Sequence, residues 1–193
     1  MVNLNIPENA PVLYVTFSAE INPSTTESLI AVMSRAAMQR VKQVHLALST
    51  PGGQVREGMN LYNILRGMPF DLATHNIGSV DSIGNAVFLA GKSRYATANS
   101  TFMFHGVGFT ITQATRLEEQ DVRDRLDSIL ADQKRIGTVI ADNSNLNPRQ
   151  VAALFRTQQT KDVSWAVEKG IVHAVRDLSI PLGSPIVSLV FQR

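Results

Sequence analysis

The 193-residue chain has no cysteine, which excludes disulfide frameworks, thiolate zinc sites and cysteine nucleophiles. Charged residues make up only 18% of the sequence, below the usual quarter, and this is compatible with a surface partly covered by partner subunits. Eighteen Lys and Arg against sixteen Asp and Glu leave a net charge of +2, without a cluster of basic residues. We therefore expect no nucleic acid as a partner.

Long hydrophobic runs are also missing. The longest apolar stretches, around 86–91 and 186–191, are far shorter than the roughly 20 residues of a membrane span. Residues 1–9 have neither the basic nor the apolar region of a signal peptide. We expect a soluble, cytoplasmic protein without a membrane partner, a metal or a cofactor.

Strand and helix signals alternate along the first half of the chain. The strands predicted from β-branched and aromatic residues are 12–17, 44–48, 71–77 (interrupted at Gly78) and 101–104. The helices predicted from apolar residues at helical spacing are 23–40, 55–65 and 82–90. This alternation predicts an α/β fold of parallel βαβ units with right-handed crossovers.

The second half is richer in charge and in helix signals. A long helix is predicted over 116–141, with an apolar stripe between charged faces that needs another surface to cover it. The remaining predicted elements are helices from Asn147-Pro148 to Phe155 and from an Asp162 cap to Lys169, and short strands at 171–175 and 186–191. We expect one domain over 1–193, with a head of about 10–105 and 145–193 and a protruding segment of about 106–144.

Two junctions between a strand and a helix carry residues suited to acyl transfer. Gly52 and Gly53 follow one strand, and glycines there let a substrate approach the backbone and leave N–H groups pointing outward. Ser82 lies at the next junction, where a helix start favours a developing anion. Taken alone, such a serine is most often a helix cap, and a glycine pair is common in tight turns.

His105 strengthens both signals because it ends the next strand, at the same edge of the sheet as Ser82. A serine, a histidine and a nearby Gly-Gly form a set of nucleophile, base and oxyanion donors. The other histidines, His45, His75 and His173, are expected to be packed or surface residues.

Four segments resemble the proteolytic subunit of the Clp ATP-dependent protease. They are Ser-Thr-Pro-Gly-Gly-Gln-Val at 49–55, Gly-Ser-Val-Asp-Ser-Ile-Gly at 78–84, Asn-Ser-Thr-Phe-Met-Phe-His at 99–105 and Glu-Lys-Gly-Ile-Val at 168–172. The resemblance covers about residues 12–175, and the first three segments together are quite specific.

The resemblance implies a serine endopeptidase with a Clp/crotonase-like spiral of βαβ units and a protruding handle helix. Ser82 would be the nucleophile, His105 the general base, and the backbone N–H groups of Gly53 and Ile83 the oxyanion hole. Peptides or unfolded proteins would be the substrates. The chain would form a homo-oligomeric ring, or two rings interlocked by the handle. A ring ATPase is the family's partner, but the segment before the first strand is short for axial pore loops.

The third member of the catalytic triad is ambiguous. The family has an Asp twelve residues before its closing glycine, and counting back from Gly170 without a gap reaches Gln158. Asp162 is the nearest carboxylate, but bringing it into place requires a four-residue deletion. Asp81 also departs from the family, which has a small residue there, and its role is unassigned.

Three alternatives stay open. A catalytically silent homologue, serving as a structural or regulatory subunit, is favoured by Gln158 and Asp81. An acyl-CoA hydratase or hydrolase of the crotonase fold would use a similar pair of backbone donors. A Ser–Lys dyad would use Lys92 as the base, although His105 fits the pattern better.

Overall fold

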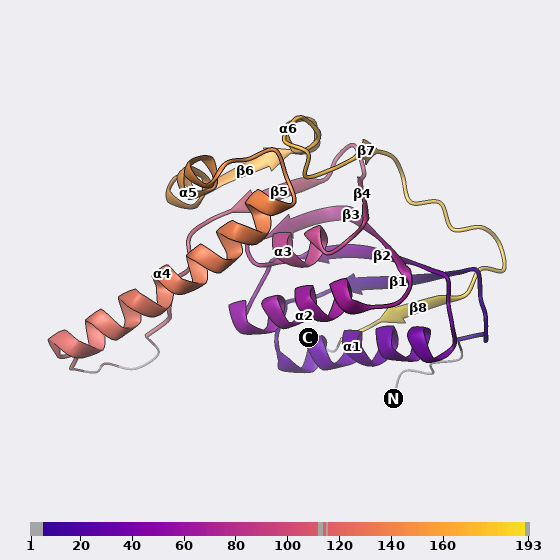
Figure 1. Ribbon diagram of the computed structural model, residues 1–193, viewed down its shortest axis with the longest axis horizontal. Coiled ribbons are helices and arrows are strands. Elements are labelled where there is room, and N and C mark those ends of the chain that lie inside the picture. Colours follow the sequence, from indigo (N-terminus) through magenta and orange to yellow (C-terminus); the bar gives the residue numbers. More distant parts are fainter. Residues whose placement is uncertain (1–5, 112–113, 115, 192–193) are drawn as a thin grey trace.

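The protein is built on one eight-stranded sheet, seen in Figure 1 in the computed structural model, which describes residues 6–111, 114 and 116–191. The strand order is β6-β5-β3-β2-β1-β8, and β4 pairs with β3 and β7. The strands are β1 Val12–Ser18, β2 Gln43–Thr50, β3 Asp71–Asp81, β4 Ser93–Ala96, β5 Thr101–Phe104, β6 Gln159–Asp162, β7 Ala174–Val175 and β8 Ile186–Leu189. All pairings are parallel except β5 with β6, so the predicted α/β fold of parallel βαβ units is confirmed.

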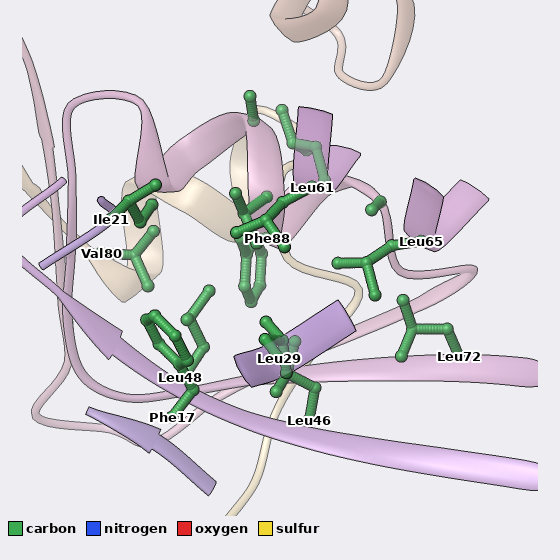
Figure 2. Packing of buried hydrophobic residues seen from close by; sticks show 14 of the residues in the cluster. Phe17, Ile21, Leu29, Leu46, Leu48, Leu61, Leu65, Leu72, Val80 and Phe88 are labelled. Atoms are coloured by element: carbon green, nitrogen blue, oxygen red, sulfur yellow. The ribbon is translucent and has the colours of Figure 1, made fainter. Parts of the chain in front are cut away.

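The helices are α1 Pro23–Met38, α2 Val55–Gly67, α3 Gly84–Leu89, α4 Glu119–Asp142, α5 Pro148–Thr157 and α6 Val163–Glu168. Figure 2 shows the core formed where the first three helices meet the sheet: Leu29 of α1, Leu61 of α2 and Phe88 of α3 face Leu46 and Leu48 of β2. All five side chains are fully buried. Such burial contributes roughly 1.5–3 kcal/mol per large apolar side chain, so this layer holds the helices on the sheet.

Local sequence signals explain where several helices begin. Asn22 forms a capping box with Thr25 before Pro23, and Asn147 forms one with Gln150 before α5. Asp162 accepts a hydrogen bond from the Trp165 backbone N–H and caps α6, as predicted. These caps fix the helix starts independently of the core.

The third strand differs from the prediction because it runs on through Gly78 to Asp81 instead of stopping. The Gly78 N–H bonds to the Asn76 side chain, and a Cβ at Gly78 would lie 3.0 Å from Ser49 Oγ, so the glycine allows close passage between strands. The first part of β3 pairs with β4 and its last part with β5. This extension carries the chain directly to Ser82.

Three other differences concern short strands. β4 and β6 were not predicted, because four-residue strands carry little periodicity and β6 consists of the polar residues Gln-Thr-Lys-Asp. The strand expected over 171–175 is reduced to β7, since Ile171 and Val172 instead enter the core beside α6. The strand expected over 186–191 is β8, which pairs in parallel with β1.

The long helix predicted over 116–141 is α4, which projects from the rest of the molecule in Figure 1. Its C-terminal part is anchored through the buried residues Ile136, Val139 and Ile140. Its N-terminal part carries the handle stripe, which we define as Val122, Leu126 and Leu130, each about half exposed. Within residues 6–111, 114 and 116–191, no helix has the length and apolarity needed to cross a membrane.

Candidate active site

Ser82 occupies a strained turn between β3 and α3. Its φ of 57° lies in the left-handed region that a non-glycine residue rarely adopts. The turn is fixed because the Ser82 N–H donates to Met103 O at 2.9 Å, and Asn85 Nδ2 donates to Ser82 O at 3.0 Å and to Met103 O at 2.9 Å. A serine on a sharp, strained turn from strand to helix is the local geometry of an exposed nucleophile.

Ser82 does not act as an ordinary helix cap. The N-cap position of α3 is Ile83, and no side chain caps the helix. The sequence pattern predicts Ser82 directly at a helix start, whereas α3 begins at Gly84 and has only six residues. The helix dipole is therefore a minor contributor here, and backbone N–H groups remain as the candidate anion donors.

The glycine pair brings a second backbone segment against Ser82. Gly52 has φ +89°, and a Cβ on it would lie 2.6 Å from Ser82 Cβ. Gly53 has φ +145°, and a Cβ there would lie 2.1 Å from Ile21 O, so the close passage of the Ile21 backbone requires a glycine. The N–H groups of Gly53 and Ile83 donate to no acceptor in the described part of the chain. Both are thus available as oxyanion donors.

His105 follows β5 and lies on the same edge of the sheet as Ser82. Its Nδ1 is 2.7 Å from Gly106 O. Because a carbonyl oxygen can only accept, Nδ1 carries the proton and Nε2 of the neutral ring keeps its lone pair. The ring is therefore set up to accept a proton at Nε2.

The four residues of the predicted set meet in one small cavity of about 100 Å³. Ser82, His105, Gly53 and Ile83 line it, and most of the rest of its lining is apolar. Ser82 and His105 do not hydrogen-bond to each other in this structure. Catalytic hydrogen bonds are often long before a substrate binds, so the shared cavity is the more informative observation.

The register of β6 shows where the two candidates for the third triad position lie. β6 runs antiparallel to β5 with Phe104 opposite Gln159 and Thr101 opposite Asp162. Gln158 is therefore level with His105. It is the exposed C-cap residue of α5, and its backbone is in the left-handed region with φ 48°. Asp162 is about four residues away along the sheet, and its carboxylate is engaged in capping α6. Among the described residues, the group that contacts Nδ1 of His105 is the Gly106 carbonyl.

The remaining candidates are placed apart from this cavity. Lys92 pairs with Asp71 at 2.8 Å, at the opposite end of β3 from Ser82, which excludes a Ser82–Lys92 dyad. His45 and His75 are buried in the sheet, and exposed His173 accepts a hydrogen bond from the Arg94 N–H. In the described ranges, no three His, Asp or Glu side chains gather as metal ligands.

Asp81 lies beside Ser82 and is half-buried. Burial raises the pKa of its carboxyl, while a hydrogen bond from the Met103 backbone and the charge of His105 oppose the rise. The interaction with His105 connects this residue electrostatically to the site.

Three contributors were not identified from sequence. The sequence marks Gly52 only as one of a glycine pair, although it is the glycine that packs against Ser82. Asn85 holds the turn at Ser82, and its position three residues after Ser82 was the available signal. The Gly106 carbonyl had no signal, because any residue supplies a backbone oxygen.

The fold and the site define a candidate serine hydrolase built on a spiral of parallel βαβ units. A family model described as Clp protease matches residues 12–178. The ATP-dependent Clp protease proteolytic subunit 1 of Leifsonia xyli subsp. xyli is 24% identical over 173 residues, covering 86% of this chain and 84% of that protein. An Asn-to-Asp mutant of ClpP1 from Listeria monocytogenes has a similar structure, with a TM-score of 0.77 and 18% identity over 86% of this chain and 91% of that chain.

The chain therefore belongs to the Clp protease family, a family of serine peptidases. The resemblance seen in the four sequence segments is confirmed, and so is the Clp-like fold.

Proposed function

We propose that the protein is a serine endopeptidase in which Ser82 is the nucleophile and His105 the general base. The observation that carries the proposal is the meeting of a strained serine turn, a histidine with Nε2 free to accept, and two unpaired backbone donors in one cavity. Peptides and segments of unfolded proteins are the proposed substrates. No step needs a metal or a cofactor.

The proposed reaction is acyl transfer in two halves. Ser82 Oγ attacks the peptide carbonyl carbon while His105 Nε2 takes the hydroxyl proton, and the N–H groups of Gly53 and Ile83 bind the oxyanion. The protonated His105 then gives its proton to the leaving amine, which frees the first product. Water, deprotonated by His105, hydrolyses the acyl-enzyme and restores Ser82.

The orienting partner of His105 in this proposal is the Gly106 carbonyl. It holds the ring in the productive tautomer through a 2.7 Å contact. A neutral carbonyl stabilises the imidazolium less than a carboxylate at Nδ1 would, since a hydrogen bond to a charged group is roughly twice as strong. We therefore expect a slow enzyme.

The handle stripe supports assembly. Val122, Leu126 and Leu130 recur every four residues on one face of α4 and are about half exposed. We propose that further copies of the chain cover this stripe, in a ring or in two rings joined through the handles. Sedimentation at tens of micromolar should show an oligomer, and a monomer at that concentration would contradict the assembly. A ring ATPase partner remains a proposal from the resemblance alone.

A catalytically silent subunit is the second candidate, favoured by the absence of a carboxylate at His105 Nδ1 among the described residues. Hydrolysis of a fluorogenic peptide by the assembled protein separates the two. Ser82→Ala should abolish hydrolysis and His105→Ala should nearly do so. Ser79→Ala makes the same chemical change three residues earlier on β3 and should leave the rate unchanged. Equal residual rates in wild type and Ser82→Ala would instead identify the silent subunit.

A further inference from the structure

Asp81 and His105 project from the same face of the sheet. Asp81 is the register partner of Met103 on the adjacent parallel strand β5, and His105 follows Met103 by two residues. Side chains two residues apart on a strand share a face. The alternation of burial agrees, since Thr101, Met103 and His105 are half-buried while Phe102 and Phe104 are fully buried. Strand spacing and rise place the Cα atoms of Asp81 and His105 about 8 Å apart.

In the described part of the chain, the other carboxylates near this end of the sheet are engaged elsewhere. Gln158 and Gln159, which the register brings level with the end of β5, are uncharged, and Asp162 is beside Thr101 with its carboxylate bonded to the Trp165 N–H. The elements packed around the cavity line it with apolar side chains: Val55 of α2, Ile136 of α4 and Phe155 of α5. Three aspartates of α4 line a neighbouring cavity with Val107 and Gly108, and each carboxylate is already engaged: Asp121 with the Glu118 N–H, Asp124 with Gln120 and Asp132 with Arg135. Among these carboxylates, Asp81 is the one that shares a face of the sheet with His105.

We propose that Asp81 is an electrostatic positioning residue whose carboxylate stabilises the protonated His105 ring that forms as Ser82 attacks. It substitutes from a neighbouring strand for the carboxylate that is missing at Nδ1. This inference rests on the proposed function, and it names a residue of that site to which the resemblance gives no role.

The raised pKa of Asp81 is consistent with this arrangement. Burial raises it, and His105 is the charged group that opposes the rise. A carboxylate that is partly withdrawn from water interacts more strongly with a nearby cation than one on the surface does. The interaction between the two residues can be tested from either side.

The first test measures the interaction between Asp81 and His105 by NMR, without an activity assay. The chain has four histidines, so the His105 ring can be followed by NMR with ¹³C-labelled histidine, and a His105→Ala sample assigns its resonance. In Asp81→Asn, which keeps the shape and an oxygen for the Met103 N–H, the His105 titration midpoint should move to lower pH. An unchanged midpoint would overturn the proposal.

The second test measures how loss of the Asp81 charge changes catalysis. With the charges taken to be as far apart as the Cα atoms, about 8 Å, and an effective dielectric constant of about 20, loss of the Asp81 charge should lower kcat/KM about thirtyfold. KM should change little, and the lower midpoint of the pH–rate profile should move in the same direction as in the NMR titration. Asp81→Glu should restore part of the rate. A shifted titration with unchanged kcat/KM would also overturn the proposal.

The matched control is Asp71→Asn, which makes the same charge change at the far end of β3. It removes only an exposed ion pair with Lys92, so it should change neither the His105 titration midpoint nor kcat/KM. The same assays separate this inference from the proposed function. If the proposed function is wrong, Ser82→Ala hydrolyses peptide as fast as wild type. Failure of this inference alone leaves Ser82→Ala inactive and Asp81→Asn as fast as wild type.

Discussion

Acidification should destabilise the folded protein through a row of rings on the sheet face opposite α1 and α2. The rings of Tyr14, His45, His75 and Tyr95 follow one another with centroids 5.0–5.1 Å apart, and the Arg176 guanidinium lies 3.7 Å from the Tyr95 centroid. His45 Nδ1 and His75 Nε2 share a hydrogen bond of 2.8 Å. His75 Nδ1 is buried without a partner in the described part of the chain, so protonation there would create an unpaired N–H.

The size of the effect follows from His75, which is 2% exposed. Burial, followed by the charges of His45 and Arg176, lowers its pKa from 6.5 to about 4. Between these two values the unfolded chain binds a proton that the folded protein does not, so stability is full above pH 6.5 and is lost as the pH falls toward 4. A pKa change of one unit corresponds to about 1.4 kcal/mol. Complete protonation of His75 therefore lowers the free energy of unfolding by ~3 kcal/mol, and about 2 kcal/mol of this is lost by about pH 5.

Urea unfolding at about pH 7.5 and about pH 5, at one protein concentration, measures this loss. The comparison is with His75→Gln, whose amide can still donate to His45 Nδ1 but does not titrate. Between the two pH values, the wild-type free energy of unfolding should fall by about 2 kcal/mol more than that of the variant. Equal falls in both proteins would refute the argument, since other acidic and basic groups are common to both.

Three further substitutions test separate parts of the structure. Asp162→Ala should lower the free energy of unfolding by about 1 kcal/mol through loss of the α6 cap, and peptide hydrolysis should persist; loss of activity in a folded oligomer would mean that Asp162 completes the triad. Gln158→Asp should raise kcat/KM by placing a carboxylate level with His105, and an unchanged pH–rate profile would argue against that proximity. Arg94→Met should cost about 3 kcal/mol in urea unfolding, because the buried guanidinium donates to four backbone carbonyl groups; a loss under 1 kcal/mol would show that water replaces those bonds.

The strand-to-helix junctions were predictable because their signals are local. Asn22-Pro23 and Asn147-Pro148 mark helix starts by capping chemistry, and Ser82 and His105 share an edge because parallel strands place their carboxyl ends together. Only side-chain type and strand order are needed for such inferences. The candidate nucleophile and base were therefore accessible from sequence.

The orienting partner of His105 was not predictable, for two physical reasons. Gly106 acts through its backbone oxygen, which leaves no trace in the sequence. The choice between Gln158 and Asp162 depends on the register of β6, a polar and largely exposed strand that pairs through its backbone without an apolar pattern. The link between Asp81 and His105 is likewise a property of register across two strands.

Labelling with a fluorophosphonate is the most direct test of the central claim, because the reagent reacts with a serine only when that serine is activated. Mass spectrometry of the assembled protein should locate a single phosphonyl adduct on Ser82, with labelling nearly absent in His105→Ala and unchanged in Ser79→Ala. Wild-type protein that stays unlabelled, or that is labelled equally with and without His105, would contradict a Ser82–His105 peptidase.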